Sequence, residues 1–384
     1  MDSVRKTFQY KLQPTPAQEQ ALAEVLWRCR TLYNCALEQR LTWWRRGQGK
    51  SATRYQQEAE LKELRQAFPE YGAIHSHVLQ DVLARLDKTY HAFFRRAASG
   101  EKPGFPRFQG KDRYHSFTSK EYGNGAHLDN GYLVLAKIGR IAVRWSRPLV
   151  GTIKTVTVSR EADGWYVSCS CAEVPIQPLP PTGKETGIDV GLKVFLITAE
   201  GEAVENPRHY RKAEKALAKA QKRLSRRKKR SKRWEKAARL VAKQHQKVRR
   251  QRRDFQHKTA LALLRTYDTL YLEDLRVANL VRNRHLSKSI SDAGWYQFRT
   301  ILAYKAACAG KQVVLVDPAY TSQDCSGCGE RVKKSLSVRT HVCPSCGLVL
   351  DRDENAARNM LQAGQAYRGA VGVPAAVKRE SVGL

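Results

Sequence analysis

Two closely spaced cysteine pairs near the C-terminus constrain the fold of this chain more than any other feature. The pairs are Cys325 with Cys328 and Cys343 with Cys346, and 14 residues separate them. This spacing is typical of a zinc ribbon, in which four thiolates surround one Zn²⁺ ion, and a glycine after each pair suits the tight turn that such a site requires. Four protein ligands leave no coordination position for a substrate, so we expect one structural zinc per chain. Disulfide bonds or a redox-active dithiol are the alternatives.

The net charge of the chain indicates a polyanionic partner. Lys and Arg number 69 against 36 Asp and Glu, which gives a formal net charge of +33 at pH 7. Such an excess opposes compaction unless it is neutralised, and nucleic acid is the usual partner. We find no apolar run of membrane-spanning length, no secretory signal and no lipidation motif, so no membrane partner is expected. Five further cysteines stand in apolar or alternating contexts and predict reduced thiols in the cytoplasm: Cys29, Cys35, Cys169, Cys171 and Cys308.

The N-terminal half is predicted to be a small β-barrel interrupted by a helical domain. Residues 6–12 read as a strand, and Thr15 and Gln18 then form a capping box around Pro16 at the first helical position. Apolar residues recur at helical spacing after this signal and again after Ser76. Alternating patterns typical of strands follow residue 100. We therefore assign residues 1–12 and 100–178 to the barrel and residues 13–99 to the helical domain.

The C-terminal half is predicted to be an α/β domain interrupted by the cysteine-rich segment. A proline-rich linker occupies residues 179–182. The α/β domain comprises residues 183–320 and 350–363, and the zinc ribbon residues 321–349. Residues 208–258 form a basic helical insertion with 23 Lys and Arg against 3 acidic residues. Residues 364–384 show weak periodicity and are predicted to be a flexible tail.

Three carboxylates stand at the ends of predicted strands or at a helix start. Asp189 and Glu273 lie on apolar strands, and Asp353 begins a helix. Burying a carboxylate is costly unless a cation neutralises it, so the three could together hold one or two Mg²⁺ ions, as in two-metal hydrolysis of a phosphodiester. Separately they could be a turn residue, a solvent-facing strand end and a helix N-cap. Asp274 and Asp351 are possible substitutes for their neighbours.

The basic insertion contains a run of consecutive cations that we expect to bind phosphates. An amphipathic helix with a solvated charged face is the alternative, but the self-repulsion of the tract favours a nucleic-acid backbone. The run is Arg226, Arg227, Lys228, Lys229 and Arg230. Aromatic and basic residues also mix at 43–46 and 105–108, where the rings could stack on unpaired bases or pack in the core.

The same residues carry a resemblance to a known family. The chain resembles TnpB, an insertion-sequence-encoded protein related to type V CRISPR effectors and to the eukaryotic Fanzor proteins. The likeness extends over about residues 4–363. It is carried by the segments 10–15, 104–108, 188–191, 272–275, 295–305, 320–323 and 351–359.

This resemblance implies a specific architecture and activity. The fold would be a multidomain α+β arrangement: a wedge β-barrel with an inserted helical recognition domain, then a RuvC-like nuclease of RNase H fold interrupted by a zinc ribbon. The protein would cleave double- or single-stranded DNA complementary to a guide RNA from the transposon end, next to a short flanking motif. Asp189, Glu273 and Asp353 would take the catalytic positions. The expected place is the nucleoid of a bacterial or archaeal cytoplasm, with no small-molecule substrate.

Three other functions remain possible from the sequence. A nuclease-inactive RNA-guided DNA-binding regulator would keep the fold without the chemistry, against which the intact carboxylates argue. A guide-independent DNA transposase should carry a sequence-reading module such as a helix-turn-helix, and we find none. A sugar-kinase or actin-like ATPase would share residues 188–191 as a first phosphate loop, but the second glycine-rich loop is absent.

Overall fold

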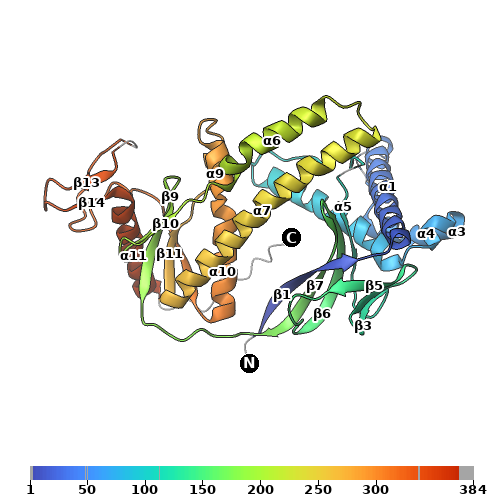
Figure 1. Cartoon of the computed structure of the whole chain (residues 1–384), viewed down its shortest axis with the longest axis horizontal. Helices are drawn as coiled ribbons and strands as arrows, with labels where there is room; N and C mark the ends of the chain where they lie inside the picture. The colour runs from blue at the N-terminus through green and yellow to red at the C-terminus, as the bar shows by residue number, and fades with distance from the viewer. Residues whose placement is uncertain (1–2, 48, 50, 112, 336–337, 372–384) are drawn as a thin grey trace. The chain divides into compact units, whose positions relative to one another are not determined.

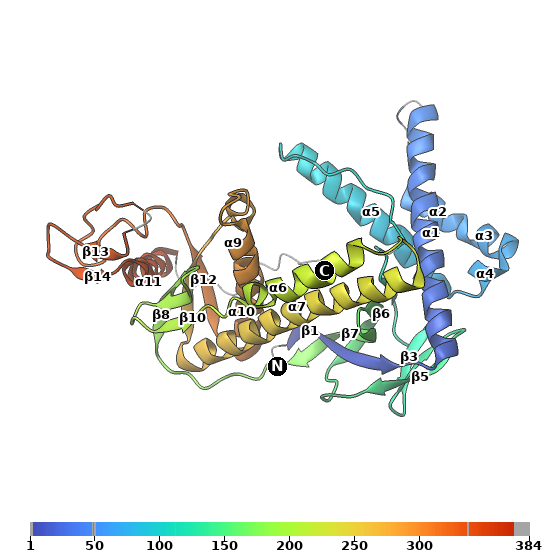
Figure 2. The same cartoon turned by 45° about the horizontal axis from the view of Figure 1, so that its top comes forward.

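The computed structural model describes residues 3–47, 49, 51–111, 113–335 and 338–371, and it divides into two compact units (Figures 1 and 2). The N-terminal unit is Met1–Pro175 and the C-terminal unit is Ile176–Leu384. Among the described residues, no helix combines the length and apolarity needed to span a membrane.

An antiparallel sheet of seven strands forms the base of the N-terminal unit. Its order is β2-β6-β7-β1-β5-β4-β3, so the N-terminal strand lies between strands that follow the helical domain in sequence. The edge strands β2 and β3 do not pair with each other among the described residues, so the predicted barrel is an open sheet. The strands are β1 (Ser3–Gln13), β2 (Ser116–Ser119), β3 (Ala126–Asp129), β4 (Tyr132–Leu135), β5 (Gly139–Arg144), β6 (Thr152–Glu161) and β7 (Gly164–Pro175).

Five helices lie between β1 and β2, as the helical spacing of residues 13–99 predicted. Thr15 Oγ1 accepts from the Gln18 amide at 3.3 Å, and the Gln18 side chain accepts from the Thr15 amide at 3.0 Å, which confirms the capping box. The apolar faces of the two long helices share one core with the sheet. The helices are α1 (Pro16–Arg46), α2 (Arg54–Ala59), α3 (Leu61–Ala67), α4 (Pro69–Gly72) and α5 (Ser76–Ala98).

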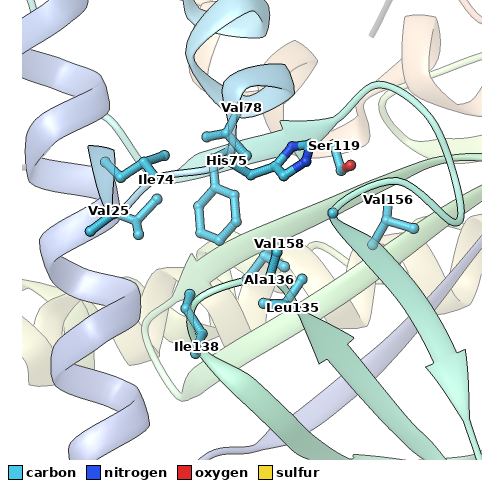
Figure 3. A pocket seen from close by; sticks show the side chains of 13 residues that line it. Val25, Ile74, His75, Val78, Ser119, Leu135, Ala136, Ile138, Val156 and Val158 are labelled. Atoms are coloured by element: carbon cyan, nitrogen blue, oxygen red, sulfur yellow. The ribbon is translucent and has the colours of Figure 1, made fainter. Parts of the chain in front are cut away.

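A small cavity lies within this core, between the helices and the sheet (Figure 3). Its walls are mostly aliphatic, and His75 and Ser119 are the polar side chains that line it. The volume is about 20 Å³, which is room for about one water molecule. This cavity is therefore a packing defect and too small for a substrate.

A mixed five-stranded sheet organises the C-terminal unit, in the order β10-β9-β8-β11-β12. The hairpin strands β8, β9 and β10 are antiparallel, whereas β8, β11 and β12 run parallel. Parallel strands need crossover connections, and helices supply them here. The strands are β8 (Glu185–Val190), β9 (Val194–Thr198), β10 (Ala203–Glu205), β11 (Thr269–Glu273) and β12 (Gln312–Val316).

Helices cover both faces of this sheet (Figure 1). On one face Ile188 and Leu272 pack with apolar residues of α7 and α10. On the other face α11 lies against Gly187 and Tyr271. The elements are α6 (His209–Ser225), α7 (Lys232–Thr266), α8 (Val277–Leu280), α9 (Ser287–Ala293), α10 (Trp295–Ala309) and α11 (Arg352–Val371), with the short strands β13 (Thr340–Val342) and β14 (Val349–Asp351) between α10 and α11.

The basic insertion consists of two helices, α6 and α7, which residues 226–231 separate. One expectation needs correction. The last helix continues to Val371, and Arg368 pairs with Glu185, so residues 364–371 do not belong to a flexible tail. The rest of the predicted tail, residues 372–384, lies outside the described residues.

Candidate metal centres

The four cysteines converge in space as their spacing predicted. Their sulfur atoms all lie within 4.8 Å of one another, with Cys325 and Cys343 buried and Cys328 and Cys346 exposed. The closest approaches, Cys325 to Cys346 at 3.6 Å and Cys328 to Cys343 at 3.5 Å, are too long for disulfide bonds. Four thiols at this separation form a cage that could bind one zinc ion.

The backbone explains why these cysteines meet. In each pair the glycine after the second cysteine donates its amide to the carbonyl of the first: Gly329 to Cys325 at 2.8 Å and Gly347 to Cys343 at 3.0 Å. Both glycines have positive φ, +80° and +73°, where a side chain would be strained. Amides of Cys346 and Ser345 hold the pKa of the Cys343 thiol at about 6. A thiolate is the form that binds zinc.

The three predicted carboxylates meet at one edge of the C-terminal sheet. Because β8 and β11 are parallel, with Ile188 opposite Leu272, the next residues Asp189 and Glu273 are neighbours. Side chains alternate along a strand, so both point to the face that α11 covers. Asp353 stands in the first turn of α11. Residues far apart in sequence are therefore placed together by strand register and by one helix start.

The three carboxylates lie close enough for their charges to act on one another. Burial raises the pKa of Asp189 well above its ordinary value, and the negative charges of Glu273 and Asp353 raise it further. Burial also raises the pKa of Glu273. Among the described residues, only the four cysteines already form a group with metal-ligand spacing. A cation between the carboxylates would relieve their repulsion, and carboxylate oxygens are the ligands that Mg²⁺ prefers.

Arginines that the sequence did not single out neutralise Asp353. Arg339 Nη1 lies 3.2 Å from both carboxylate oxygens, and Arg352 Nη2 lies 3.1 Å from Oδ1. Arg339 precedes β13, so the cysteine-rich segment contributes a cation to the acidic site. Arg352 lies within the segment 351–359 that carries the family resemblance, but nothing in the sequence indicated its ion pair.

The two substitute carboxylates have other partners. Asp351 is exposed and its Oδ1 accepts from the Asp353 amide at 2.8 Å, so it caps α11. Asp274 is also exposed, and Arg299 Nη1 binds its Oδ1 at 2.5 Å. The carboxylate charges that raise the pKa of Asp189 are those of Glu273 and Asp353.

The predicted phosphate-binding cations form the loop between α6 and α7. All five, from Arg226 to Arg230, are exposed, and Ser231 caps the following helix. The aromatic side chains for which stacking or core packing was left open are also exposed, namely Trp43, Trp44, Phe105 and Phe108.

Sequence comparisons assign the chain to a family. It is 38% identical over 377 residues to a Streptomyces pristinaespiralis protein named "Putative RNA-guided DNA endonuclease", covering 95% of this chain and 91% of the relative. It is 32% identical over 387 residues to InsQ of Escherichia coli K12, which has the same description, covering 94% of this chain and 92% of that protein. TnpB-like protein L770 of Acanthamoeba polyphaga mimivirus is 28% identical over 237 residues, 57% of this chain and 45% of that protein. The chain belongs to the TnpB family.

Family models match three segments. One described as "Probable transposase" matches residues 156–284, one described as "Cas12f1-like, TNB domain" matches residues 295–360, and one described as "Helix-turn-helix domain" matches residues 1–49. The last match differs from the expectation that the chain carries no helix-turn-helix. In the described part of 1–49, however, the chain forms only β1 and the single long helix α1.

A solved structure shares the fold. The Cas12f1 chain in a cryo-EM structure with sgRNA and target DNA aligns with a TM-score of 0.58 at 11% identity, covering 93% of this chain and 98% of that one. The two chains therefore share a mixed α and β fold.

Proposed function

We propose that this protein is an RNA-guided DNA endonuclease, which cleaves DNA complementary to a transposon-derived guide RNA next to a short flanking motif. The observation that carries the proposal is the position of Asp189, whose carboxylate stands beside Glu273 and Asp353 where two parallel strands end. Relatives that match almost the whole chain are named as RNA-guided DNA endonucleases. The formal net charge of +33 suits a nucleic-acid partner.

The C-terminal sheet and α11 would form the RuvC-like nuclease, of RNase H type, and the cysteine cage its zinc ribbon. Support comes from the strand directions, with three antiparallel strands followed by two parallel ones, and from the acidic residues on the face under α11. Asp189, Glu273 and Asp353 would hold one or two Mg²⁺ ions, which supply activation of the attacking water and stabilisation of the leaving oxygen. The arginines beside Asp353 would meanwhile limit repulsion among the carboxylates.

The nucleic-acid partners would be the guide RNA and the DNA target. Pairing between guide and target strand would select the sequence, and protein side chains would read only the flanking motif. The loop from Arg226 to Arg230 would hold backbone phosphates of the RNA or of the heteroduplex, because its five cations are exposed and consecutive.

Two experiments test this function. The chain is expressed with transposon-end RNA and challenged with plasmid targets, and cleavage should follow a rewritten guide and stop when the RNA is omitted. Cutting by RNA-free protein at a position that ignores the guide would instead identify a guide-independent transposase. In the second experiment, Asp189→Ala and Glu273→Ala should abolish cleavage while target binding remains.

A nuclease-inactive DNA-binding regulator is the second candidate. The ion pairs of Asp353 with Arg339 and Arg352 favour it, because they occupy a carboxylate that a catalytic metal ion would need. One relative, Cas12m of Allomeiothermus silvanus, is named a DNA-binding protein and is 31% identical over 131 residues. Guide-directed binding without cleavage at any Mg²⁺ or Mn²⁺ concentration would establish this function.

A further inference from the structure

The acidic residue at the end of β11 has a hydrogen-bond donor from a distant segment. Thr321 Oγ1 donates to Glu273 Oε1 at 2.5 Å. Thr321 is only 7% exposed, so water competes little for this contact. It lies between β12 and the first cysteine pair, 48 residues after Glu273 in sequence.

The helix that carries Asp353 fixes the same segment. Asn359 Nδ2 donates to the Thr321 carbonyl at 2.8 Å and to the Asp324 carbonyl at 2.6 Å. Asn355 Nδ2 donates to the Asp324 carbonyl at 2.8 Å, and its Oδ1 accepts from the Ser326 amide at 3.0 Å. Asn355 is fully buried. Because the two asparagines are one turn apart, α11 binds residues 321–326 through one side.

The backbone just before Thr321 is held in an uncommon conformation. Tyr320 has φ +63°, a left-handed value that non-glycine residues rarely adopt. The Arg331 guanidinium lies 3.5 Å from the centre of the Tyr320 ring, and Arg331 Nε donates to Asp324 Oδ1 at 2.8 Å. Strained conformations persist where several contacts enforce them, and they occur often at functional sites.

We propose that Thr321 is a positioning residue for Glu273, and that residues 320–326 are a brace that fixes the end of β11 relative to α11. The proposal rests on the proposed nuclease function, in which Glu273 and Asp353 act together. Thr321 contacts one of these carboxylates, and its own carbonyl is bound by the helix that bears the other. The brace contains Cys325, so the cysteine cage also helps to hold it in place.

The test compares three variants of the full chain bound to guide RNA. Thr321→Val keeps the shape of the side chain but removes the hydroxyl, Thr321→Ser keeps the hydroxyl, and Ser326→Ala removes a hydroxyl from the same segment that is buried without a hydrogen-bond partner. Partners that orient metal ligands typically contribute about 10- to 100-fold in affinity or activity. We expect Thr321→Val to lower cleavage at least about tenfold and to raise the Mg²⁺ concentration needed for half-maximal cleavage. Thr321→Ser and Ser326→Ala should behave like the wild type.

A second measurement does not depend on activity. Calorimetric titration of Mn²⁺ into the full chain without nucleic acid should show about tenfold weaker binding in Thr321→Val and unchanged binding in Thr321→Ser. Target binding should be equal in all variants. Wild-type cleavage and Mn²⁺ affinity in Thr321→Val, while Glu273→Gln is inactive, would overturn the positioning role and leave the nuclease proposal intact. If Glu273→Gln also cleaves, the nuclease site itself is wrongly assigned.

Discussion

At the scale of single residues, the choice between Asp351 and Asp353 shows what a pattern of acidic residues leaves open. Both stand at the start of one helix, and the sequence offered each as a metal ligand or a cap. The structure separates them. The exposed Asp351 side chain accepts a hydrogen bond from the Asp353 amide. Asp353 is only 8% exposed, and its charge acts on Asp189. Asp351 therefore caps α11.

Single substitutions at these two positions should have opposite effects. Asp351→Ala removes the cap and should lower the free energy of unfolding by about 1 kcal/mol with cleavage retained. Asp353→Ala should abolish guided cleavage and leave target binding nearly unchanged. Urea unfolding and a plasmid cleavage assay measure the two effects. Loss of cleavage in Asp351→Ala with full activity in Asp353→Ala would transfer the catalytic role to Asp351.

A partly buried ion pair between Asp268 and Lys311 contributes to stability in a pH-dependent way. Asp268 accepts from Lys311, which is 7% exposed, and from the amides of Thr182 and Gly183 at 2.9 and 2.8 Å. The Lys311 ammonium, above all, holds the pKa of Asp268 far below its usual range. Because the folded pKa is depressed, this contribution is present above the unfolded pKa of about 3.9 and is lost as pH falls through the folded pKa.

Asp268→Asn should therefore destabilise the protein at pH 7 by about 2 kcal/mol, since a buried ammonium loses its charged partner. The difference from the wild type should shrink as pH falls below about 4. Denaturant unfolding at several pH values measures it. Asp254→Asn is the control, because its ion pair with Lys258 is exposed and should contribute little. A difference that stays constant down to the lowest pH would contradict the role of the Asp268 charge.

At the scale of elements, local signals were predictable and distant ones were not. The start of α1 followed from Thr15 and Gln18 because a capping box lies within four residues. The start of α6 lacks a cap of its own, and its Tyr210 amide instead donates at 3.0 Å to Asp292, which is 82 residues away. Only the folded chain brings that carboxylate to the helix. The length of α11 was missed for the same reason, because its last turns pack on Tyr271 and pair with Glu185.

The close packing of α11 on the sheet leads to a matched pair of predictions. A Cβ at Gly364 would lie 1.9 Å from Cδ1 of Tyr271, whereas one at Gly369 on the same helix would meet nothing within 4 Å. Gly364→Ala should therefore destabilise the protein by about 2 kcal/mol through overpacking. Gly369→Ala should stabilise it slightly, because alanine favours helix. Thermal unfolding compares them, and equal shifts for both would show that α11 does not pack as described.

At the scale of the whole molecule, the sequence predicted the types of domain and their order along the chain. It did not predict whether the N-terminal sheet closes into a barrel. The cysteine spacing and the three carboxylates pointed to groups that the fold brings together, because each belongs to a strand end or turn with a local signature. The open sheet of the N-terminal unit was not predictable, since the pairing of edge strands depends on contacts between distant segments. The roles of Thr321 and Arg339 likewise arise only from tertiary contacts.

The large positive charge gives a prediction for the molecule as a whole. Affinity for nucleic acid should fall steeply with salt, with a slope set by the number of phosphates that are neutralised. Replacing Arg226, Arg227, Lys228, Lys229 and Arg230 with Gln should lower the magnitude of the slope of log affinity against log salt by about 3 to 4, if each cation binds one phosphate. Fluorescence anisotropy with guide RNA at several salt concentrations measures this slope.

A control variant distinguishes direct phosphate contact by residues 226–230 from the effect of the protein's net charge. Five exposed cations of α6 can be replaced with Gln at the same cost in net charge: Lys212, Lys215, Lys219, Lys222 and Arg223. Phosphate binding by the loop between α6 and α7 requires a clearly larger change of slope in the loop variant than in the α6 variant, because counterions are released only where phosphates are neutralised. Equal changes would mean that the tract attracts nucleic acid through its overall field, and the assignment of these five residues as phosphate ligands would then be wrong.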